Sequence, residues 1–366
     1  MTADIDTRYM SHALTLGRRG QGRVWPNPAV GCVLVRDGRI VGRGWTQDGG
    51  RPHAEVVALA QAGALARGAT AYVTLEPCNH FGQSGPCSEA LIEAGVARVC
   101  AAVEDPDPRV SGKGIARLRE AGIEVEVGVC GAAAEADHMG FFHRVRDGRP
   151  MVTLKLASSF DGRIATASGQ SQWITGAHAR RMVHAMRARH DAVMVGGGTA
   201  RQDDPSLTVR GLGIEKQPVR IVVSRRLDVP LMGKLARTAT EAPVWICHGP
   251  DASAELVRAW QGLGAKLLPC ATRGGHLDTR AVLAALGEAG LTRVFCEGGG
   301  MLAASLLEAR CVDQLVGFTA GLGIGAEGLP SIGALGLSDL GAAERFELAQ
   351  VCQSGADIMH RWRKPG

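Results

Sequence analysis

Apolar and polar residues in the first part of the chain follow two spacings, one helical and one extended. Residues 4–19 carry apolar side chains at three- and four-residue intervals, which predicts an amphipathic helix. Residues 29–35 form an almost continuous apolar run, and residues 39–44 follow the dipeptide Asp37-Gly38, which is typical of tight hairpin turns. The pattern therefore predicts a helix followed by a β-hairpin.

Strands and helices alternate over the residues that follow the hairpin. The predicted helices begin near His53 and Cys87 and cover 115–121, and the predicted strands are 72–75, 98–103 and 123–127. A chain that alternates in this way forms one sheet with helices on both faces. We therefore expect an α/β/α domain in the first half of the chain.

The pattern breaks at residues 146–150, where a polar segment containing Gly and Pro separates a helix from a new apolar strand at 151–156. Such a segment is typical of a boundary between domains. The length of 366 residues also suggests two domains. We predict one domain over residues 1–147 and a second over residues 148–366.

The second half contains two glycine turns, each after a predicted strand. The predicted strands are 192–195, 219–224 and 244–247, with a helix at 177–189. Gly196-Gly197-Gly198 follows the first of these strands, and Glu297-Gly298-Gly299-Gly300 lies between a strand and a helix within 291–309. A glycine turn at a helix N-terminus is a natural anion site, although many such turns are purely structural. Neither turn is the G-x-G-x-x-G fingerprint of dinucleotide-binding folds. Two turns in one domain favour a cofactor that carries phosphate.

Composition excludes several classes of protein. The net charge is only +5, and the arginines are scattered, which argues against a nucleic-acid groove. The N-terminus lacks the pattern of a secretory signal, and no apolar run is long enough to span a membrane. Several of the ten cysteines lie inside apolar strands, so we expect reduced thiols and a cytoplasmic protein.

His53, Cys78 and Cys87 can supply three zinc ligands, and Glu55 lies two residues after the histidine. Zinc takes nitrogen and sulfur ligands, and a catalytic zinc keeps its fourth position for water. The signature H-x-E followed by P-C-x-x-C belongs to zinc deaminases that act on nucleobases. Here eight residues, not two, separate the cysteines. The ligands nevertheless fall at a strand end and at helix starts, where α/β sheets bind ligands.

Each part of this motif has a simpler interpretation when it is taken alone. A His-x-Glu is often a solvated helix start, and free cysteines are often small buried apolar residues. Asn27 lies between two prolines, where it is equally compatible with a turn residue and with an amide that binds a base edge. The polar, glycine-containing loop 79–85 could bind phosphate through its backbone N–H groups.

Taken together, these motifs resemble the bifunctional riboflavin-biosynthesis deaminase/reductase family, from about residue 7 to the last strands. The eight-residue gap between the cysteines is itself typical of that family. The segments that carry the resemblance are Pro26-Asn27-Pro28, His53-Ala54-Glu55, Thr74 to Cys78, Pro86-Cys87, 104–108, Lys155 to Arg163, Ser171 to Thr175, Asp203 to Arg210 and Glu297-Gly298-Gly299.

The resemblance implies a cytidine-deaminase-like domain followed by a dihydrofolate-reductase-like α/β domain. The first would hydrolyse the exocyclic amine of 2,5-diamino-6-ribosylamino-4(3H)-pyrimidinone 5′-phosphate with one zinc ion per chain. The second would use NADPH to reduce the ribosyl chain, giving 5-amino-6-ribitylamino-uracil 5′-phosphate. The expected partner is thus a small phosphorylated pyrimidine, with no nucleic acid and no membrane. We also expect a homo-oligomer, although the sequence does not specify the number of subunits.

The resemblance also implies roles for single residues. His53, Cys78 and Cys87 would hold zinc, Glu55 would transfer protons, Asn27 would contact the base edge, and His80 would lie near the substrate phosphate. The expected NADPH contacts are Ala157, Trp173, Thr199, Asp203, Ser224 and Gly299. The expected contacts to the reductase substrate are Ser171, Arg187, Leu207, Arg210 and Glu297.

Two other functions are compatible with parts of the sequence. One is deamination of a different base, with the second half acting as a binding domain. The other is a regulatory or scaffold protein with a structural zinc. A structural site needs a fourth protein ligand, and the sequence offers no obvious one beside Glu55. The absence of such a ligand favours an open, catalytic site.

Overall fold

Residues 2–80, 85–108 and 110–365 are described by a computed structural model. The chain divides into two units, Met1–Gly148 and Arg149–Gly366, and each is described by itself. The sequence pattern placed the boundary one residue earlier. Of the helices that the structure describes, none combines the length and the apolar character needed to cross a membrane.

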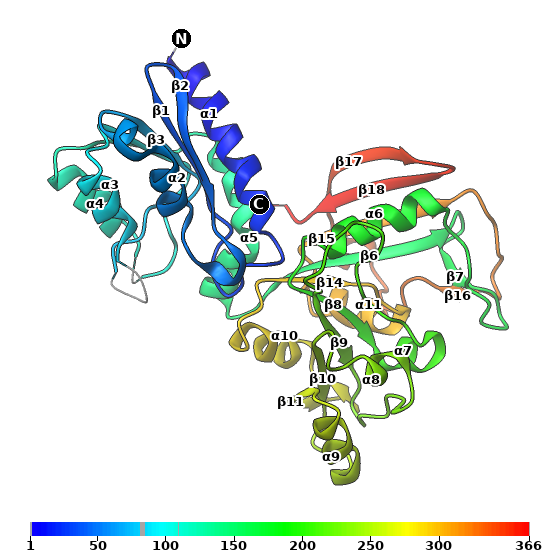
Figure 1. Cartoon of the computed structure of the whole chain (residues 1–366). Coiled ribbons are helices and arrows are strands. Elements are labelled where there is room, and N and C mark those ends of the chain that lie inside the picture. Colours follow the sequence, from blue (N-terminus) through cyan, green and yellow to red (C-terminus); the bar gives the residue numbers. More distant parts are fainter. Residues whose placement is uncertain (1, 81–84, 109, 366) are drawn as a thin grey trace. The chain divides into compact units, whose positions relative to one another are not determined.

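The first unit is built on a five-stranded sheet with the order β2-β1-β3-β4-β5 (Figure 1). β1 pairs antiparallel with β2 and β3, and β3, β4 and β5 are parallel. The strands are β1 (Gly31–Arg36), β2 (Arg39–Trp45), β3 (Thr70–Val73), β4 (Arg98–Ala101) and β5 (Glu124–Val127). The predicted hairpin is confirmed, because Asp37 and Gly38 connect β1 to β2 with φ of 49° and 71°.

Helices cover both faces of this sheet, as the alternating pattern predicted. α1 and α5 pack together on one face, and α2, α3 and α4 gather on the other (Figure 1). The helices are α1 (Thr2–Gly17), α2 (Ala54–Ala62), α3 (Cys87–Glu93), α4 (Lys113–Glu120) and α5 (Gly131–Asp147), with short 3-10 turns at Arg18–Gly20, Asp48–Gly50 and Gly63–Ala66. Gly44 lets α2 lie close to β2, because a Cβ there would be 2.0 Å from the carbonyl oxygen of Ala54. The start of α2 is thereby held against the sheet.

The second unit is built on a nine-stranded sheet with the order β11-β10-β9-β8-β14-β6-β15-β18-β17. The strands from β11 to β15 are parallel, and β18 and β17 add an antiparallel edge. The strands are β6 (Met151–Ser159), β8 (Ala192–Gly196), β9 (Val219–Val223), β10 (Val244–His248), β11 (Lys266–Pro269), β14 (Arg293–Cys296), β15 (Gln314–Ala320), β17 (Glu347–Ser354) and β18 (Asp357–Arg363).

Smaller elements complete the second unit. Two short strand pairs lie outside the main sheet, β7 (Arg163–Ala165) with β16 (Leu329–Pro330) and β12 (Thr272–Arg273) with β13 (His276–Leu277). The helices are α6 (Ala177–Arg187), α7 (Gly197–Asp203), α8 (Lys234–Arg237), α9 (Ala254–Gly262), α10 (Thr279–Glu288) and α11 (Gly300–Glu308), with a 3-10 turn at Leu340–Ala342. Trp260, Phe295 and Phe318 are among the side chains that fill the core.

The sequence pattern assigned no separate strand after residue 309, where β15, β17 and β18 lie. β17 is exposed along most of its length, so it lacks the apolar alternation that marks a half-buried strand.

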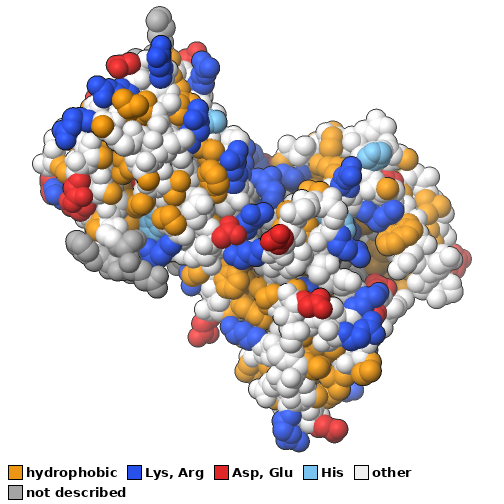
Figure 2. Space-filling view, in the orientation of Figure 1, with side chains coloured by type: hydrophobic (Ala, Val, Ile, Leu, Met, Phe, Trp, Pro, Cys, Tyr) orange, Lys and Arg blue, Asp and Glu red, His pale blue; other side chains and the backbone are white. Residues whose placement is uncertain are grey.

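Lys and Arg side chains lie on both units among acidic and apolar ones (Figure 2).

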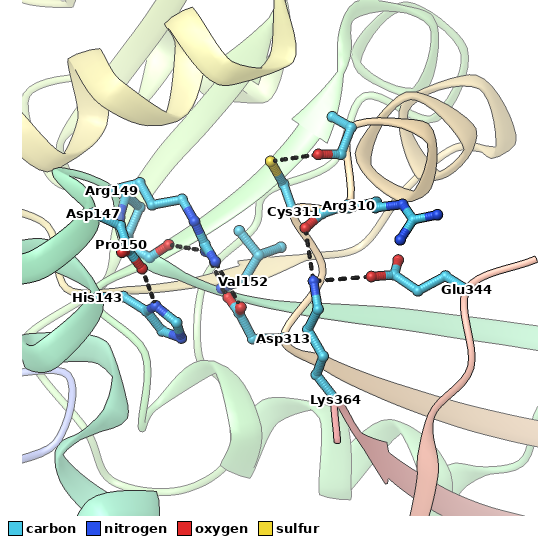
Figure 3. A network of polar contacts seen from close by, with 11 residues as sticks. His143, Asp147, Arg149, Pro150, Val152, Arg310, Cys311, Asp313, Glu344 and Lys364 are labelled. Atoms are coloured by element: carbon cyan, nitrogen blue, oxygen red, sulfur yellow. Dashed lines mark hydrogen bonds and ion pairs between the residues drawn. The ribbon is translucent and has the colours of Figure 1, made fainter. Parts of the chain in front are cut away.

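The Asp313 side chain links the N-terminal ends of β6 and β15, two central strands of the second unit (Figure 3). Its carboxylate accepts two hydrogen bonds of 2.8 Å from the Arg149 guanidinium and one of 2.8 Å from the Val152 N–H. The side chain of Asp313 is only 2% exposed. Nearby, the Lys364 ammonium after β18 donates to the Arg310 carbonyl at 3.0 Å and pairs with Glu344. These contacts join β6, β15 and the end of the chain.

We expect Asp313→Ala to weaken this part of the sheet by about 3–5 kcal/mol, because it leaves a largely buried guanidinium and a strand N–H without their acceptor. Hydrogen exchange of β6 and β15 peptides in the full chain measures the loss. Glu347→Ala is the control, because its ion pair with Arg363 is exposed and should contribute less than about 1 kcal/mol. Equal effects of the two variants would contradict the role of Asp313.

Candidate active sites

His53, Cys78 and Cys87 converge at the ends of three different elements of the first unit. His53 precedes the first residue of α2, Cys78 follows β3, and Cys87 is the first residue of α3. The Nδ1 atom of His53 lies 3.3 Å from the Sγ atom of Cys87 and 3.6 Å from that of Cys78. One nitrogen and two sulfur atoms therefore face a common point, with all three within 4.8 Å of one another.

These separations fit a zinc ion. With a Zn–S bond of about 2.3 Å and a Zn–N bond of about 2.1 Å, tetrahedral geometry separates nitrogen and sulfur ligands by about 3.6 Å. Hydrogen bonds from Cys87 and from His53 lower the pKa of the Cys78 thiol to about 4, and the neighbouring Cys78 raises the pKa of Cys87. Two thiols this close share one proton unless a cation replaces it. The donor set therefore suits a divalent metal.

Glu55 lies in the first turn of α2 beside these ligands and is only 3% exposed. Burial raises the pKa of this carboxyl to about 7, and the negative charge of Cys78 acts in the same direction. A carboxyl with a pKa near neutrality can both accept and release a proton, which is the property that a general acid–base needs.

His53, Cys78 and Glu55 line a cavity of about 320 Å³. Asn27 and His80 both line it, so the structure brings these two predicted residues to the same site. Asn27 fits closely against Gly50, where a Cβ would lie 1.9 Å from the Asn27 Nδ2 atom. Residues 81–84 of the predicted phosphate loop lie outside the described residues.

Several charged residues that line the cavity were not predicted as site residues from the sequence. Asp105 and Asp107 line it from the segment 104–108, and Arg51 and Arg144 bring positive charge. Burial raises the pKa of Asp105 to about 6. The polar segment 104–108, with its two prolines, was the feature of the sequence that could have indicated these residues. Its position over the site depends on a carboxylate that is distant in the sequence.

That carboxylate belongs to Glu76, which is buried just before Cys78. It accepts backbone N–H bonds from Asp105 at 3.2 Å, Gly112 at 3.0 Å and Gly114 at 2.9 Å, and a further one from Ile115. These bonds hold the chain between β4 and α4 over the cavity. Glu76 thus positions Asp105 without itself being part of the metal site.

In the second unit, Arg187 at the end of α6 and Glu297 after β14 form an ion pair. The Nε atom of Arg187 donates to Glu297 Oε1, and Nη2 donates to Oε2 at 2.9 Å. Burial opposes ionisation of Glu297, but Arg187 lowers the pKa of the carboxyl overall. These two predicted substrate residues are therefore brought together.

Lys155 of β6 comes directly after Leu154, which lies opposite Cys296 of β14, so Lys155 is level with Glu297 in the sheet. Lys155 was not predicted as a site residue, although it stands in a motif of the sequence. Burial lowers the pKa of Lys155, the charge of Glu297 opposes this, and Arg187 adds to it. A single lysine among the apolar residues of the strand was the feature of the sequence that could have indicated this role. Its partners are more than thirty residues away, so their proximity follows only from the fold.

The loop after α7 completes this side of the site. Arg187 Nη1 donates to the Thr208 carbonyl at 2.8 Å, and the Arg210 N–H donates to His184 Nδ1 at 3.2 Å. Leu207 has a φ of 54° and its side chain is buried in the core, so only its backbone can face a substrate. Ser171 is half-buried in the segment before α6.

The two glycine turns lie side by side. Gly196 N–H donates to the Gly298 carbonyl at 3.1 Å, and Gly299 N–H donates to Thr199 Oγ1 at 3.3 Å. The predicted cofactor residues Thr199 and Gly299 are thus in contact. Ser224 follows β9 next to the same region.

The other predicted cofactor residues are more dispersed. Ala157 lies on β6, two residues beyond Lys155 on the same face of the strand, and Asp203 is the last residue of α7. Trp173 is 67% exposed and lies under the Arg180 guanidinium, whose carbon is 4.4 Å from the ring centre.

Comparison with known proteins agrees with this division into two chemistries. Residues 3–103 match the cytidine and deoxycytidylate deaminase zinc-binding region, and residues 150–360 match the RibD C-terminal domain. The riboflavin biosynthesis protein RibD of Aquifex aeolicus is 42% identical over 98% of this chain and 98% of its own length. The chain belongs to the RibD family. The RibD protein of Escherichia coli is likewise 42% identical, over 96% of this chain.

Solved RibD structures have the same fold. RibD of Acinetobacter baumannii superposes with a TM-score of 0.88 at 38% identity, and both chains are covered completely. The deaminase/reductase of Thermotoga maritima superposes with a TM-score of 0.87 at 33% identity over the full length of both chains. The expected fold class, a cytidine-deaminase-like domain followed by a reductase domain, is confirmed.

As a RibD protein, the chain is a bifunctional enzyme of riboflavin biosynthesis with a deaminase and a reductase activity. It acts on a small molecule. Its zinc-binding region supports zinc as a cofactor of the deaminase, and its reductase domain implies a nicotinamide cofactor.

Proposed function

We propose that the first unit hydrolyses the exocyclic amine of 2,5-diamino-6-ribosylamino-4(3H)-pyrimidinone 5′-phosphate. We further propose that the second unit then reduces the ribosyl chain with NADPH, giving 5-amino-6-ribitylamino-uracil 5′-phosphate. The main support is the convergence of His53, Cys78 and Cys87 beside the buried Glu55, next to a cavity that His53, Cys78 and Glu55 line. The Thermotoga maritima relative is named for the same two reactions.

In the deaminase, His53, Cys78 and Cys87 would hold zinc, which would supply hydroxide near neutral pH because zinc lowers the pKa of bound water. Glu55 takes a proton from the attacking water and delivers protons to the ring nitrogen and then to the leaving amine. Its position at the cavity wall and its pKa near 7 suit both transfers.

Other cavity residues bind the substrate. The Asn27 amide pairs with the base edge, which presents both donors and acceptors. Arg51, Arg144 and His80 line the same cavity and provide donors for a phosphate. A phosphorylated pyrimidine therefore finds complementary groups at both of its ends.

Opening of the ribose ring moves the N–H proton to the ring oxygen and leaves a C1′=N imine. A bound nicotinamide would supply a hydride to C1′, and one proton must then be delivered to the imine nitrogen. Lys155 is the proposed donor for this step, because β6 pairs with β14 with Leu154 opposite Cys296, which brings Lys155 level with Glu297. Arg187 uses three donors on Glu297 and Thr208, so it orients the site and contacts the substrate with its remaining N–H groups. We assign binding of the substrate's phosphate dianion to Arg210.

The test supplies the diamino substrate and NADPH to the purified protein and follows NADPH absorbance, with and without prior removal of zinc by a chelator. Oxidation that needs the substrate and stops without zinc supports both reactions and their order. Adding the deaminated intermediate should restore oxidation to the zinc-free enzyme. Failure of both compounds to oxidise NADPH would contradict the proposed reductase reaction.

We expect Arg210→Ala to raise the reductase KM by roughly 10- to 100-fold, because a charge-assisted hydrogen bond contributes about 1.5–3 kcal/mol. Deamination should be unaffected, since Arg210 belongs to the other unit. Steady-state kinetics with the deaminated intermediate measures the change, and Arg258→Ala on α9 is a matched exposed control. A joint loss of both activities would contradict the assignment.

A further inference from the structure

A second cavity, of about 560 Å³, lies in the reductase unit where the parallel strands β8 and β9 end. One wall is the glycine turn Gly196-Gly197-Gly198, a second is the segment Ser224-Arg225-Arg226, and a third comes from α10 and α11. Neither arginine takes part in the proposed deaminase or reductase reaction. Their position suggests that they bind a part of the cofactor that lies far from the reacting nicotinamide.

The topology around this cavity is that of a dinucleotide-binding unit. β8 leads through the glycine turn into α7, and the chain returns as β9, which pairs parallel to β8 with Gly196 opposite Val223. In such units the pyrophosphate lies at the turn after the first strand. The residue at the end of the neighbouring strand then reads the 2′ position of the adenosine ribose. Here that position is occupied by Ser224-Arg225-Arg226.

The two walls are close enough to share one ligand. A Cβ on Gly197 would lie 3.0 Å from Ser224 Oγ and 3.2 Å from Arg201 Nη1. The glycine turn therefore presents its backbone directly to the end of β9. A pyrophosphate at this turn would place the attached ribose toward Ser224 and the two arginines.

The charges at the end of β9 favour a phosphate over a hydroxyl. An acid at this place reads a ribose 2′-hydroxyl, whereas an arginine accommodates a 2′-phosphate. The one acid in the segment, Asp228, already accepts a hydrogen bond from Ser224 Oγ at 2.5 Å and pairs with Arg201 at 2.8 Å. Its charge is thus compensated by groups within the protein.

The two arginines remain available at the cavity wall. Arg225 pairs with Asp251, and both side chains are partly open to water, which weakens the interaction. Arg226 is exposed and has no ion-pair partner in the part of the chain that the structure describes. A guanidinium suits a phosphate because its planar donors match two phosphate oxygens.

We propose that Arg225 and Arg226 bind the 2′-phosphate of the adenosine ribose and thereby make NADPH the preferred cofactor over NADH. This inference rests on the proposed reductase function and identifies the residues that determine its preference between the two nicotinamide cofactors. Binding energy at the 2′-phosphate lowers the KM for NADPH alone, because NADH carries a hydroxyl at that position.

The test compares kcat/KM for NADPH and NADH, with the deaminated pyrimidine as substrate, in the wild-type enzyme and in Arg225→Ala, Arg226→Ala and the double variant. Each single substitution should lower the NADPH/NADH ratio by about 10- to 100-fold, as expected for loss of a charge-assisted hydrogen bond. Arg258→Ala, an exposed arginine on α9 outside the cavity, is the matched control and should leave the ratio unchanged. A ratio that survives in the double variant would overturn the proposal.

A binding measurement separates this inference from the proposed function. By calorimetry, wild-type protein should bind 2′,5′-ADP at least 10-fold more tightly than 5′-AMP, and the double variant should lose that difference. Equal affinities in the wild type would overturn the 2′-phosphate site. Substrate-dependent oxidation of NADH with that result would leave the reductase function intact, whereas no oxidation of either nicotinamide would contradict the function itself. Ammonia release by each variant verifies that the deaminase unit is folded, and an unchanged rate with NADH verifies the same for the reductase unit.

Discussion

Replacing Glu55 with Gln lowers the rate of deamination by about 10²- to 10⁴-fold while zinc stays bound, the loss expected when a general acid–base is removed. The amide has nearly the same shape as the carboxyl but cannot accept the proton of the attacking water. Glu55 is not one of the three ligands that converge on a common point, so the metal content should be preserved.

Ammonia release measures the loss, and elemental analysis measures zinc per chain. The reductase step of the same preparation, supplied with the deaminated intermediate, verifies that the second unit is intact. Glu89→Gln is the matched control, because Glu89 lies on α3 and pairs with Arg117 outside the cavity. Near-normal turnover by Glu55→Gln would remove Glu55 from its assigned role.

Replacing Lys155 with Met lowers the reductase kcat by about 10²- to 10⁴-fold, the range for loss of a positioned proton donor. The methionine keeps much of the apolar stem but removes the ammonium and leaves the Arg187–Glu297 pair without its neighbour. Deamination should continue at the normal rate, because Lys155 belongs to the second unit.

Lys155→Arg separates the charge from the proton transfer. Arginine keeps the positive charge beside Glu297 but does not release a proton at accessible pH. We therefore expect Lys155→Arg to restore the substrate KM more than kcat. A kcat fully restored by arginine would show that charge alone is required and would contradict proton donation by Lys155.

The pH dependence provides a second measurement of the same role. Burial lowers the pKa of Lys155 from its ordinary value of 10.5, Glu297 opposes that shift, and Arg187 adds to it. Only the protonated amine can donate, so the reductase rate should fall as pH rises through this lowered pKa. The fall should disappear in Lys155→Met. An unchanged profile in that variant would assign the titration to another group.

The local sequence determined the deaminase site to a large extent. His53, Glu55, Cys78 and Cys87 each stand at the end of a strand or the start of a helix, and the apolar pattern predicts those boundaries. A parallel sheet brings such ends to one edge, so their convergence followed once the order of elements was predicted. The hairpin at Asp37-Gly38 was predictable for the same reason, since the turn is encoded by adjacent residues.

Tertiary structure alone decided the contacts between distant residues. Arg187 and Glu297 are 110 positions apart, and Glu76 accepts hydrogen bonds from residues 29 to 39 positions further along the chain. No local spacing encodes these pairs, because they depend on which strands become neighbours in the sheet. The same holds for Lys155 and for the arginines after β9. The sequence around these residues does not distinguish them from other charged residues. Only the pairing of β6 with β14 brings Lys155 level with Glu297, and only the packing of β8 and β9 places the two arginines at a cavity.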